Sequence, residues 1–424
     1  MKNIIQPIKG SRDFYPELMR KRNWLYSLIR EVSESFGYEE WEGPYLEKIA
    51  LYAAKSGDEL VKEQAFVFPD RGGEMITLRP ELTPTLARMI AQKQNELVFP
   101  LKWWSFGPFW RYERPQKGRT REFFQWNIDL IGVNNPLADA EIIAVASNFF
   151  SKAGLNSDKI RLKVNNRKLM DSEVQRIGFG EDQKGMVLKL IDRKDKLPSD
   201  AWEKYVLDNG VKPTQLEDLK NLLADKNLWK KSPELSELFN VIGKMGVGDY
   251  LEYDPQVIRG LDYYTGTVFE ARDASGEKRA ILGGGHYDNL VADVGGGALP
   301  GVGFAMGDVV ISLLLEEENL FPAGPANPAD VLVTIFDPTS TAKSVTLDAE
   351  LRKGGLKTSL YPEPAKLDKQ LKYADRVGFR FVVILGPDEM TKGFITLKDL
   401  RARTQQIVDL EGLAARITKM LETK

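Results

Sequence analysis

The chain has 424 residues, of which 42% are apolar and 28% charged, enough material for two or three domains with buried cores. Its formal net charge of -2 identifies no partner, because a near-neutral total can hide a local basic surface. The sequence contains no cysteine and a single histidine, His286, which excludes disulfides, thiolate metal sites, cysteine nucleophiles and a histidine-rich zinc site.

Apolar runs give no sign of export or membrane insertion. No run of about 18 uninterrupted apolar residues occurs, and the N-terminal residues MKNIIQPIKGSRDFYP lack the apolar segment and cleavage site of a secretory signal. We therefore expect a cytoplasmic protein without a membrane span. Any metal is expected to be a hard cation held by carboxylates or phosphates.

The first expected element is a long amphipathic helix. Apolar residues recur at helical spacing between residues 18 and 36, and Gly37 follows where a helix takes its C-terminal glycine. Further on, the segment LRPELTPTLARM places Glu81 and Thr83 beside two prolines. Thr83 could cap a helix, or both polar residues could bind a ligand, and the pattern alone leaves both interpretations open.

Residues 101–132 predict a long antiparallel hairpin with strands at 101–114 and 121–132. Its loop region is strongly basic and contains Arg111, Arg114, Lys117, Arg119 and Arg121. A solvated ribbon of alternating charge is the commoner meaning of such a pattern. Strand alternation would nevertheless place Arg111 and Glu113 on one face, and the loop cations could reach a phosphate chain or an RNA end.

Residues 167–250 are polar and highly charged with short helical patterns, which predicts a helical insertion in a strand-rich domain. A second hairpin is expected at 264–284, with DASGEK as its turn. The segment GVGFAMGDVVISLLLEE then leads from a glycine-bearing strand into a helix. In ILGGGHYDNL, the glycines allow close approach of the backbone to a ligand, whereas His286 is expected to be a hydrogen-bonded or exposed bystander.

The segment FPAGPANPAD has the composition of a stiff linker. We expect one domain over residues 1–325 and another over 326–424. From residue 329 onward, β-branched runs alternate with helical segments in the order β-α-β-α-β, which predicts a small α/β domain. The fold class is therefore expected to be α+β with a C-terminal α/β domain.

Five segments together resemble the histidyl-tRNA synthetase family of class II aminoacyl-tRNA synthetases. RGLDYYTGTVFE and LGGGHYDNL are similar to the family's two histidine signatures. The class II motifs 1, 2 and 3 resemble, in the family's order, FGYEEWEGPYLE, FGPFWRYERPQKGRTREFFQWNIDLIG and VGFAMGD. A domain similar to the family's anticodon-binding domain follows, so the resemblance covers nearly the whole chain.

The resemblance implies an antiparallel sheet of about six strands flanked by helices, in a homodimer formed through motif 1. It also implies attachment of L-histidine to tRNA(His) with ATP and Mg²⁺, through a histidyl-adenylate. No segment matches the P-loop pattern G-x-x-x-x-G-K-[ST], so arginine side chains would have to hold the nucleotide's phosphates.

For the nucleotide, the resemblance assigns catalytic roles to Arg111 and Arg259, which would hold the α-phosphate from two sides. Glu113 would contact the adenine, and Arg119 would reach the β- and γ-phosphates. Arg121 is a further candidate for ATP binding. Phosphoryl displacement needs positioning and charge stabilisation more than a titrating base, so a histidine-poor protein suits it.

For the amino acid, the family pattern places Glu81, Thr83 and Gln125 around the α-ammonium group. The imidazole would lie in a pocket made by a carboxylate and three phenols, namely Asp129, Tyr263, Tyr264 and Tyr287. Such a pocket rejects other side chains because they leave its buried polar groups unpaired.

The sequence departs from the family pattern at three positions. Asp129 stands where many members have glutamate, and His286 replaces an arginine common in the second signature. Val310 occupies the place of an arginine that the motif 3 helix usually carries toward adenine or the γ-phosphate. The ATP site would then rely more on Arg119 or Arg121.

Two other classes of function are weighed against the ligase. One is a non-catalytic, histidine-sensing regulatory subunit of ATP phosphoribosyltransferase, a class that typically lacks the C-terminal domain and the catalytic arginines. The other is an RNA-binding module with an inactive site, suggested by Val310. In the ligase interpretation, Arg114 and Gln116 in the hairpin loop are candidates for reading the 5′ end of the tRNA.

Overall fold

The computed structural model divides into two compact units, Met1–Phe321 and Pro322–Lys424, each with a hydrophobic core of its own. The structure describes residues 4–53, 60–258, 264–276, 278–324 and 327–422. The boundary lies within the proline-containing segment that the sequence marks as a linker. In the described ranges, no helix is long and apolar enough to cross a membrane.

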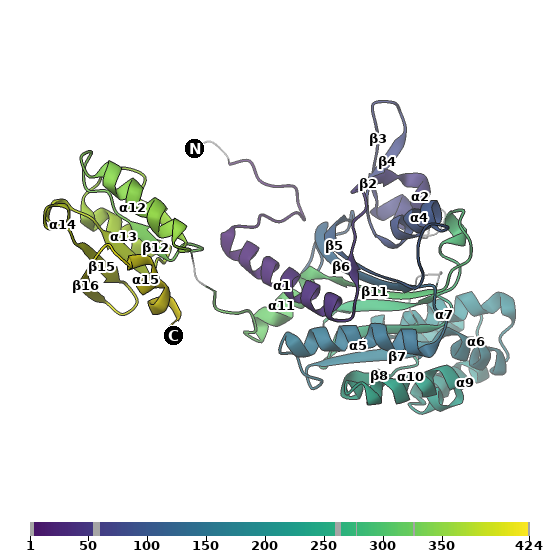
Figure 1. Cartoon of the computed structure of the whole chain (residues 1–424). Helices are drawn as coiled ribbons and strands as arrows, with labels where there is room; N and C mark the ends of the chain where they lie inside the picture. The colour runs from purple at the N-terminus through teal and green to yellow at the C-terminus, as the bar shows by residue number, and fades with distance from the viewer. Residues whose placement is uncertain (1–3, 54–59, 259–263, 277, 325–326, 423–424) are drawn as a thin grey trace. The chain divides into compact units, whose positions relative to one another are not determined.

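An eight-stranded sheet organises the larger unit (Figure 1). Its strand order is β1-β5-β6-β11-β10-β9-β7-β8, in which the inner six strands pair antiparallel and the edge strands β1 and β8 pair parallel to their neighbours. The strands are β1 (Glu39–Glu40), β5 (Leu101–Trp110), β6 (Glu122–Ile131), β7 (Ile160–Asn166), β8 (Leu251–Tyr253), β9 (Thr267–Asp273), β10 (Leu282–Tyr287) and β11 (Gly301–Gly307).

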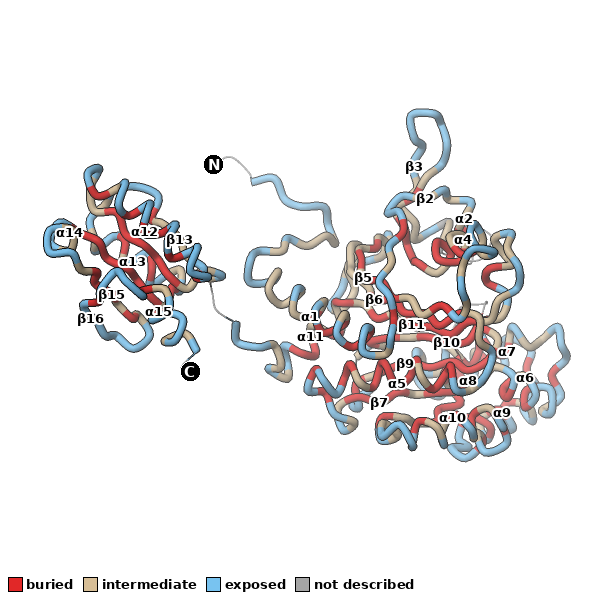
Figure 2. Tube along the Cα trace, viewed as in Figure 1, coloured by how far each residue is buried: buried red, intermediate tan, exposed pale blue. Residues whose placement is uncertain are grey.

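Helices cover one face of this sheet and bury most of the hydrophobic core there. They are α1 (Pro16–Ser35), α5 (Pro136–Lys152) and α11 (Asp308–Glu317). α5 begins sharply because the Asn135 side chain accepts a hydrogen bond from the Ala138 N–H at 3.0 Å, with Pro136 at the first helical position. Figure 2 shows the strands beneath these helices as the most buried part of the unit.

The other face carries a smaller group of elements. α2 (Ile49–Ala53), α4 (Thr83–Lys93) and a three-stranded antiparallel sheet lie together there (Figure 1). The order of that sheet is β2-β4-β3, and its strands are β2 (Leu46–Lys48), β3 (Phe66–Pro69) and β4 (Met75–Leu78). α4 packs on the large sheet through Leu86, Ala87 and Ile90.

Alternation along β11 separates these two faces sharply. Val302, Phe304 and Met306 point into the core beneath α1 and α5. The residues between them point to the α4 face and are all small, namely Gly301, Gly303, Ala305 and Gly307. The same alternation on β6 sends Trp126, Ile128 and Leu130 into the core and leaves the polar residues of that strand on the α4 face. One face of these strands therefore carries large hydrophobic side chains, whereas on the other face β11 carries only glycine and alanine.

Residues 167–250 form a helical insertion between the parallel-paired strands β7 and β8. Its helices are α6 (Arg167–Arg176), α7 (Lys184–Asp192), α8 (Ser199–Asp208), α9 (Pro213–Ala224) and α10 (Pro233–Lys244). Their buried leucines and valines join the same core as the sheet, so the insertion packs as part of this unit.

The smaller unit has a five-stranded sheet of order β13-β12-β14-β15-β16. Its first three strands are parallel and connected by helices, as the sequence predicts, and an antiparallel hairpin adds two more. The elements are β12 (Val331–Val333), α12 (Thr341–Lys353), β13 (Thr358–Leu360), α13 (Leu367–Val377), β14 (Phe381–Ile384), α14 (Pro387–Lys392), β15 (Ile395–Asp399), β16 (Thr404–Val408) and α15 (Leu413–Glu422).

Three local expectations need correction. The first strand of the basic hairpin ends at Trp110, so Arg111 and Glu113 lie beyond the regular ladder and alternation does not set their direction. The second hairpin, expected at 264–284, extends further, because its second strand β10 runs from Leu282 to Tyr287 and includes His286. Thr83 is the first residue of α4 and Leu82 occupies the capping position, so Thr83 is not the cap.

Candidate active site

A buried carboxylate and two phenols lie together on the α4 face of the large sheet. Tyr287, at the end of β10, donates a hydrogen bond from its hydroxyl to Oδ1 of Asp129 on β6 at 2.9 Å. Tyr264 joins Tyr287 in the same apolar cluster, which includes Leu86 of α4. Three of the residues expected around an imidazole, from three separate segments, are thus brought together.

Burial changes the ionisation of this group. It raises the pKa of Asp129 to about 7, although the hydrogen bond from Tyr287 partly opposes the shift. Burial, together with the charge of Asp129, also raises the pKa of Tyr287 well above its ordinary value. Tyr287 is therefore a hydrogen-bond donor at neutral pH, and Asp129 changes its charge near neutrality.

Glycines make room for these side chains. A Cβ atom on Gly303 would collide with the Asp129 carboxylate, and one on Gly301 would lie 2.6 Å from the Tyr287 ring. A Cβ on Gly285 would lie 2.8 Å from the ring of Tyr264. The site therefore has a floor of bare backbone, which accounts for Gly301 and Gly303 in GVGFAMG.

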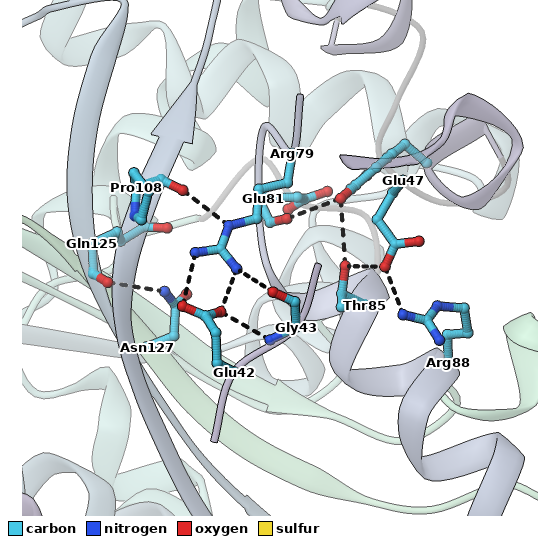
Figure 3. A network of polar contacts seen from close by, with 11 residues as sticks. Glu42, Gly43, Glu47, Arg79, Glu81, Thr85, Arg88, Pro108, Gln125 and Asn127 are labelled. Carbon is cyan, nitrogen blue, oxygen red and sulfur yellow. Dashed lines mark hydrogen bonds and ion pairs between the residues drawn. The ribbon is translucent and has the colours of Figure 1, made fainter. Parts of the chain in front are cut away.

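Arg79 is a fully buried arginine that organises the surrounding backbone (Figure 3). Its Nε donates to the Pro108 carbonyl at 2.9 Å, and its Nη1 donates to the Gly43 carbonyl at 3.2 Å and to the Glu42 carboxylate. Arg79 thereby joins the segment after β1, the end of β5 and the residues before α4. Sequence reasoning did not select it, because a lone arginine after a short strand carries no pattern.

The residues expected around an α-ammonium group lie close to this arginine in the fold. Glu81 is buried two residues after Arg79, and Tyr52 donates from its hydroxyl to the Glu81 carbonyl at 3.4 Å. Gln125 on β6 lies opposite Gly107 of β5, and a Cβ on Gly107 would touch the Arg79 guanidinium. Thr83 is half-buried at the start of α4.

A second polar network supports α4 (Figure 3). Glu47 of β2 accepts hydrogen bonds from the Thr85 hydroxyl at 3.1 Å and from Arg88 at 2.7 Å. These bonds tie the small sheet to the first turns of α4, which carries Thr83. The segment with Glu81 and Thr83 is therefore held from both sides.

A cavity of about 190 Å³ lies where the basic hairpin meets the start of α11. It is lined by Arg111, Glu113, Gly118, Arg119, Thr120, Phe123, Arg279, Ala280, Ile281, Gly307, Val309 and Val310. Three residues expected at a nucleotide, Arg111, Glu113 and Arg119, thus surround one space. Arg119 forms an ion pair with Glu113, and the Arg111 Nε donates to the Pro80 carbonyl at 2.9 Å, next to Glu81.

Other residues of the basic loop lie elsewhere. Arg121 is outside the lining of this cavity, its guanidinium lies 4.0 Å from the centroid of the Tyr112 ring, and its Nε donates to the Glu113 carbonyl at 3.1 Å. Arg114 and Gln116 are exposed at the loop tip. Backbone hydrogen bonds in both directions between Gln116 and Arg119 close a tight turn there.

An ion pair between Arg12 and the buried Asp308 lies at the start of α11. Asp308, the first residue of α11, accepts hydrogen bonds from Arg12 at 2.9 Å and from the Phe124 backbone N–H at 2.9 Å. Burial raises the pKa of Asp308, and the Arg12 charge opposes that shift. The pair joins the N-terminal segment, β6 and α11, and the sequence gives no local signal for it.

The single histidine lies on the opposite face of the sheet, beneath α5. The Nδ1 atom of His286 is 2.9 Å from Oδ1 of Asp139, and its Nε2 is 3.4 Å from Oδ1 of Asp288. Although burial alone would lower the pKa of His286, the hydrogen bond to Asp139 and the charges of Asp139 and Asp288 raise it overall. His286 is thus a hydrogen-bonded structural residue and does not face the candidate site.

Two of the residues expected at the site, Arg259 and Tyr263, lie outside the described residues. Among the residues that are described, no group of three acidic or imidazole side chains converges in the manner of a metal site.

Comparisons with known proteins agree with the resemblance. A family model described as histidyl-tRNA synthetase matches residues 10–308, and one described as anticodon binding domain matches residues 330–420. The chain is 38% identical over 419 residues to histidine–tRNA ligase, chloroplastic/mitochondrial, of Arabidopsis thaliana, an alignment that covers 96% of this chain and 86% of that protein.

Solved structures share the fold. The histidyl-tRNA synthetase of Nostoc sp. PCC 7120 superposes with a TM-score of 0.83 at 27% identity and covers 99% of this chain and 100% of that one. A Bacillus halodurans C protein described as an ATP phosphoribosyltransferase regulatory subunit/histidyl-tRNA synthetase gives 0.73 at 20% identity, covering 88% and 97%. At that identity the second match concerns the fold alone.

Proposed function

The chain belongs to the histidyl-tRNA synthetase family, and we infer that it is a histidine–tRNA ligase that uses ATP with Mg²⁺ to charge tRNA(His). One observation carries this most directly. Asp129 and Tyr287 lie on strands of the same sheet that carries the Arg111 cavity, and Arg111 in that cavity donates a hydrogen bond to the Pro80 carbonyl, next to Glu81. An amino acid and a nucleotide bound there would meet.

The first step joins the histidine carboxylate to the α-phosphate of ATP. A carboxylate oxygen forms a bond to the α-phosphorus while the bond to the bridging oxygen breaks, and pyrophosphate leaves. We assign to Arg111 and Arg259 the stabilisation of the charge that develops on the α-phosphate. Mg²⁺ would neutralise part of the triphosphate charge. A ribose hydroxyl at the end of the tRNA then takes the acyl group and releases AMP.

Recognition of histidine would depend on the Asp129 pocket. A neutral imidazole can donate its ring N–H to the Asp129 carboxylate, beside Tyr264, Tyr287 and Tyr263. The α-ammonium group would lie near Glu81, with Thr83 and Gln125 as further hydrogen-bonding groups. The burial of Asp129 supports this selectivity, because an amino acid without a ring N–H would not supply the additional hydrogen bond that the buried carboxylate can accept beside the one from Tyr287.

For the macromolecular partners, we assign anticodon contacts to the C-terminal unit and contacts with the 5′ end to Arg114 and Gln116. The exposure of both loop residues is consistent with that role. We also propose a homodimer through the motif 1 segment. In support, Tyr45 and Leu46 are exposed hydrophobic residues, and β1 is an edge strand.

Histidine-dependent exchange between ATP and pyrophosphate tests the assignment. The wild-type protein should catalyse exchange that requires histidine, and Arg259→Ala should reduce it by several orders of magnitude. Histidine binding without any exchange would instead favour the histidine-sensing regulatory subunit. The near-full-length similarity to curated ligases and the presence of the C-terminal unit argue against that alternative.

A further inference from the structure

The nucleotide cavity has an apolar residue where the family pattern expects a cation. Val310 lies in the first turns of α11 and lines the cavity. The hairpin loop packs closely over it, since a Cβ on Gly118 would lie 3.6 Å from Val310 Cγ2. At position 310, helix α11 therefore contributes an apolar contact to the hairpin loop and no positive charge.

A different segment brings an arginine to the same space. Arg279 lines the cavity together with Val310, Arg111 and Arg119, and lies just before β10. It is far from all three in sequence, and its position depends on the pairing of β10 with β11.

An ion-pair cluster fixes the segment that carries Arg279. Lys278 lies 2.8 Å from the Glu317 carboxylate, and Lys117 of the hairpin loop lies 3.7 Å from the same group. Glu317 is seven residues after Val310 on α11, so the two project from the same side of the helix. One carboxylate thus lies within ion-pair distance of a lysine from the hairpin loop and of the lysine next to Arg279.

The guanidinium of Arg279 is available to a ligand. Arg119 is paired with Glu113, and Arg111 donates to the Pro80 carbonyl. Arg279 is exposed, and with the residues that the structure describes it forms no hydrogen bond or ion pair. A guanidinium group is planar and positively charged, so without a protein partner it can form two hydrogen bonds to one phosphate.

We propose that Arg279 binds the terminal phosphates of ATP and replaces the missing cation at position 310. This assignment rests on the proposed ligase function. Phe123, Ile281 and Val309 provide apolar surface for the adenine, with Glu113 as a hydrogen-bond acceptor for its amino group. The triphosphate then extends toward the cations, and Arg279 acts as a positioning residue for the departing pyrophosphate.

The test measures ATP–pyrophosphate exchange with Arg279→Ala and Arg279→Lys in the full-length protein. Loss of a charge-assisted phosphate contact should raise KM for ATP about 10- to 100-fold and change KM for histidine less than about threefold. Arg279→Lys should recover part of the loss, because it keeps the charge without the fork. Lys189→Ala, which removes an exposed cation from α7, serves as the matched control and should behave as wild type.

Inhibition by AMP separates a phosphate contact from general damage to the site. AMP has no terminal phosphates, so its inhibition constant should be the same in wild type and Arg279→Ala. Equal weakening of AMP and ATP binding would overturn the assignment, and so would an unchanged KM for ATP in an active variant. Absence of exchange in the wild type would instead refute the ligase function itself.

Discussion

Asp129 makes the charge of the candidate histidine pocket depend on pH near neutrality. Its pKa is about 7 in the folded protein and about 3.9 in an unfolded chain. Between these values the folded state binds the extra proton, so the Asp129 contribution to stability falls as pH rises from about 4 to 7 and is constant above. A ligand that donates a hydrogen bond to the carboxylate reverses that preference.

We therefore expect KM for histidine to decrease as pH rises from 6 to 8, because ionised Asp129 is the better acceptor. In Asp129→Asn, KM for histidine should rise about 10- to 100-fold, with a smaller dependence on pH. Exchange kinetics at several pH values would measure both effects, and the variant corrects for titration of the substrate's own imidazole. An identical pH profile in the variant would contradict a direct contact.

His286 permits a second measurement at this scale, because it is the single histidine of the chain. Its imidazole should titrate above the ordinary value of about 6.5 in an NMR experiment, and Asp139→Asn should lower that pKa. The stabilisation from its protonated form is complete below about pH 6.5 and is lost as pH rises through the raised pKa. A pKa at or below 6.5 in the wild type would contradict the ion-pair geometry.

At the scale of the element, β11 is the strand that most directly shapes the site. Gly303→Ala would force a methyl group against the Asp129 carboxylate and the Ile128 carbonyl. We expect a loss of about 1–3 kcal/mol in the free energy of unfolding and weaker histidine binding. Urea unfolding and the KM for histidine would measure these effects.

Gly185→Ala on α7 provides the matched control for that change. A Cβ there meets nothing within 4 Å among the described residues, and alanine is the better helix former. The control should therefore leave stability equal or improved by up to about 1 kcal/mol. Equal destabilisation by Gly303→Ala and Gly185→Ala would contradict the inference that Gly303 is needed to make room for the Asp129 carboxylate.

The sequence predicts those elements whose signals lie within a few neighbouring residues. Helix α1, both hairpins and the change from strand to helix after Met306 are encoded by periodicity and turn residues. Arg79, the Arg12–Asp308 pair and Arg279 were missed, since each acts on residues that only the tertiary fold brings near. The direction of Arg111 and Glu113 was inferred wrongly from alternation, because the strand ends before them.

At the scale of the molecule, the two units have separate cores, so the activity of the larger unit can be measured without the C-terminal one. Deletion of residues 322–424 should leave histidine-dependent exchange within about threefold of wild type. Aminoacylation of tRNA should fall much further, because the deleted unit matches an anticodon-binding domain. Comparison of the two assays on one preparation measures this, and parallel loss of both activities would show that the C-terminal unit is required for the catalytic unit's stability.

The glycine floor also limits how substrate preference could be redesigned. Glycine has no side chain to truncate, so substitutions at Gly301 or Gly303 narrow the pocket and none deepens it. A variant that accepts a bulkier amino acid would have to shorten the walls instead, at Tyr287 or Asp129. Substitutions can therefore enlarge the proposed histidine pocket at its side walls, whereas no substitution can enlarge it at its glycine floor.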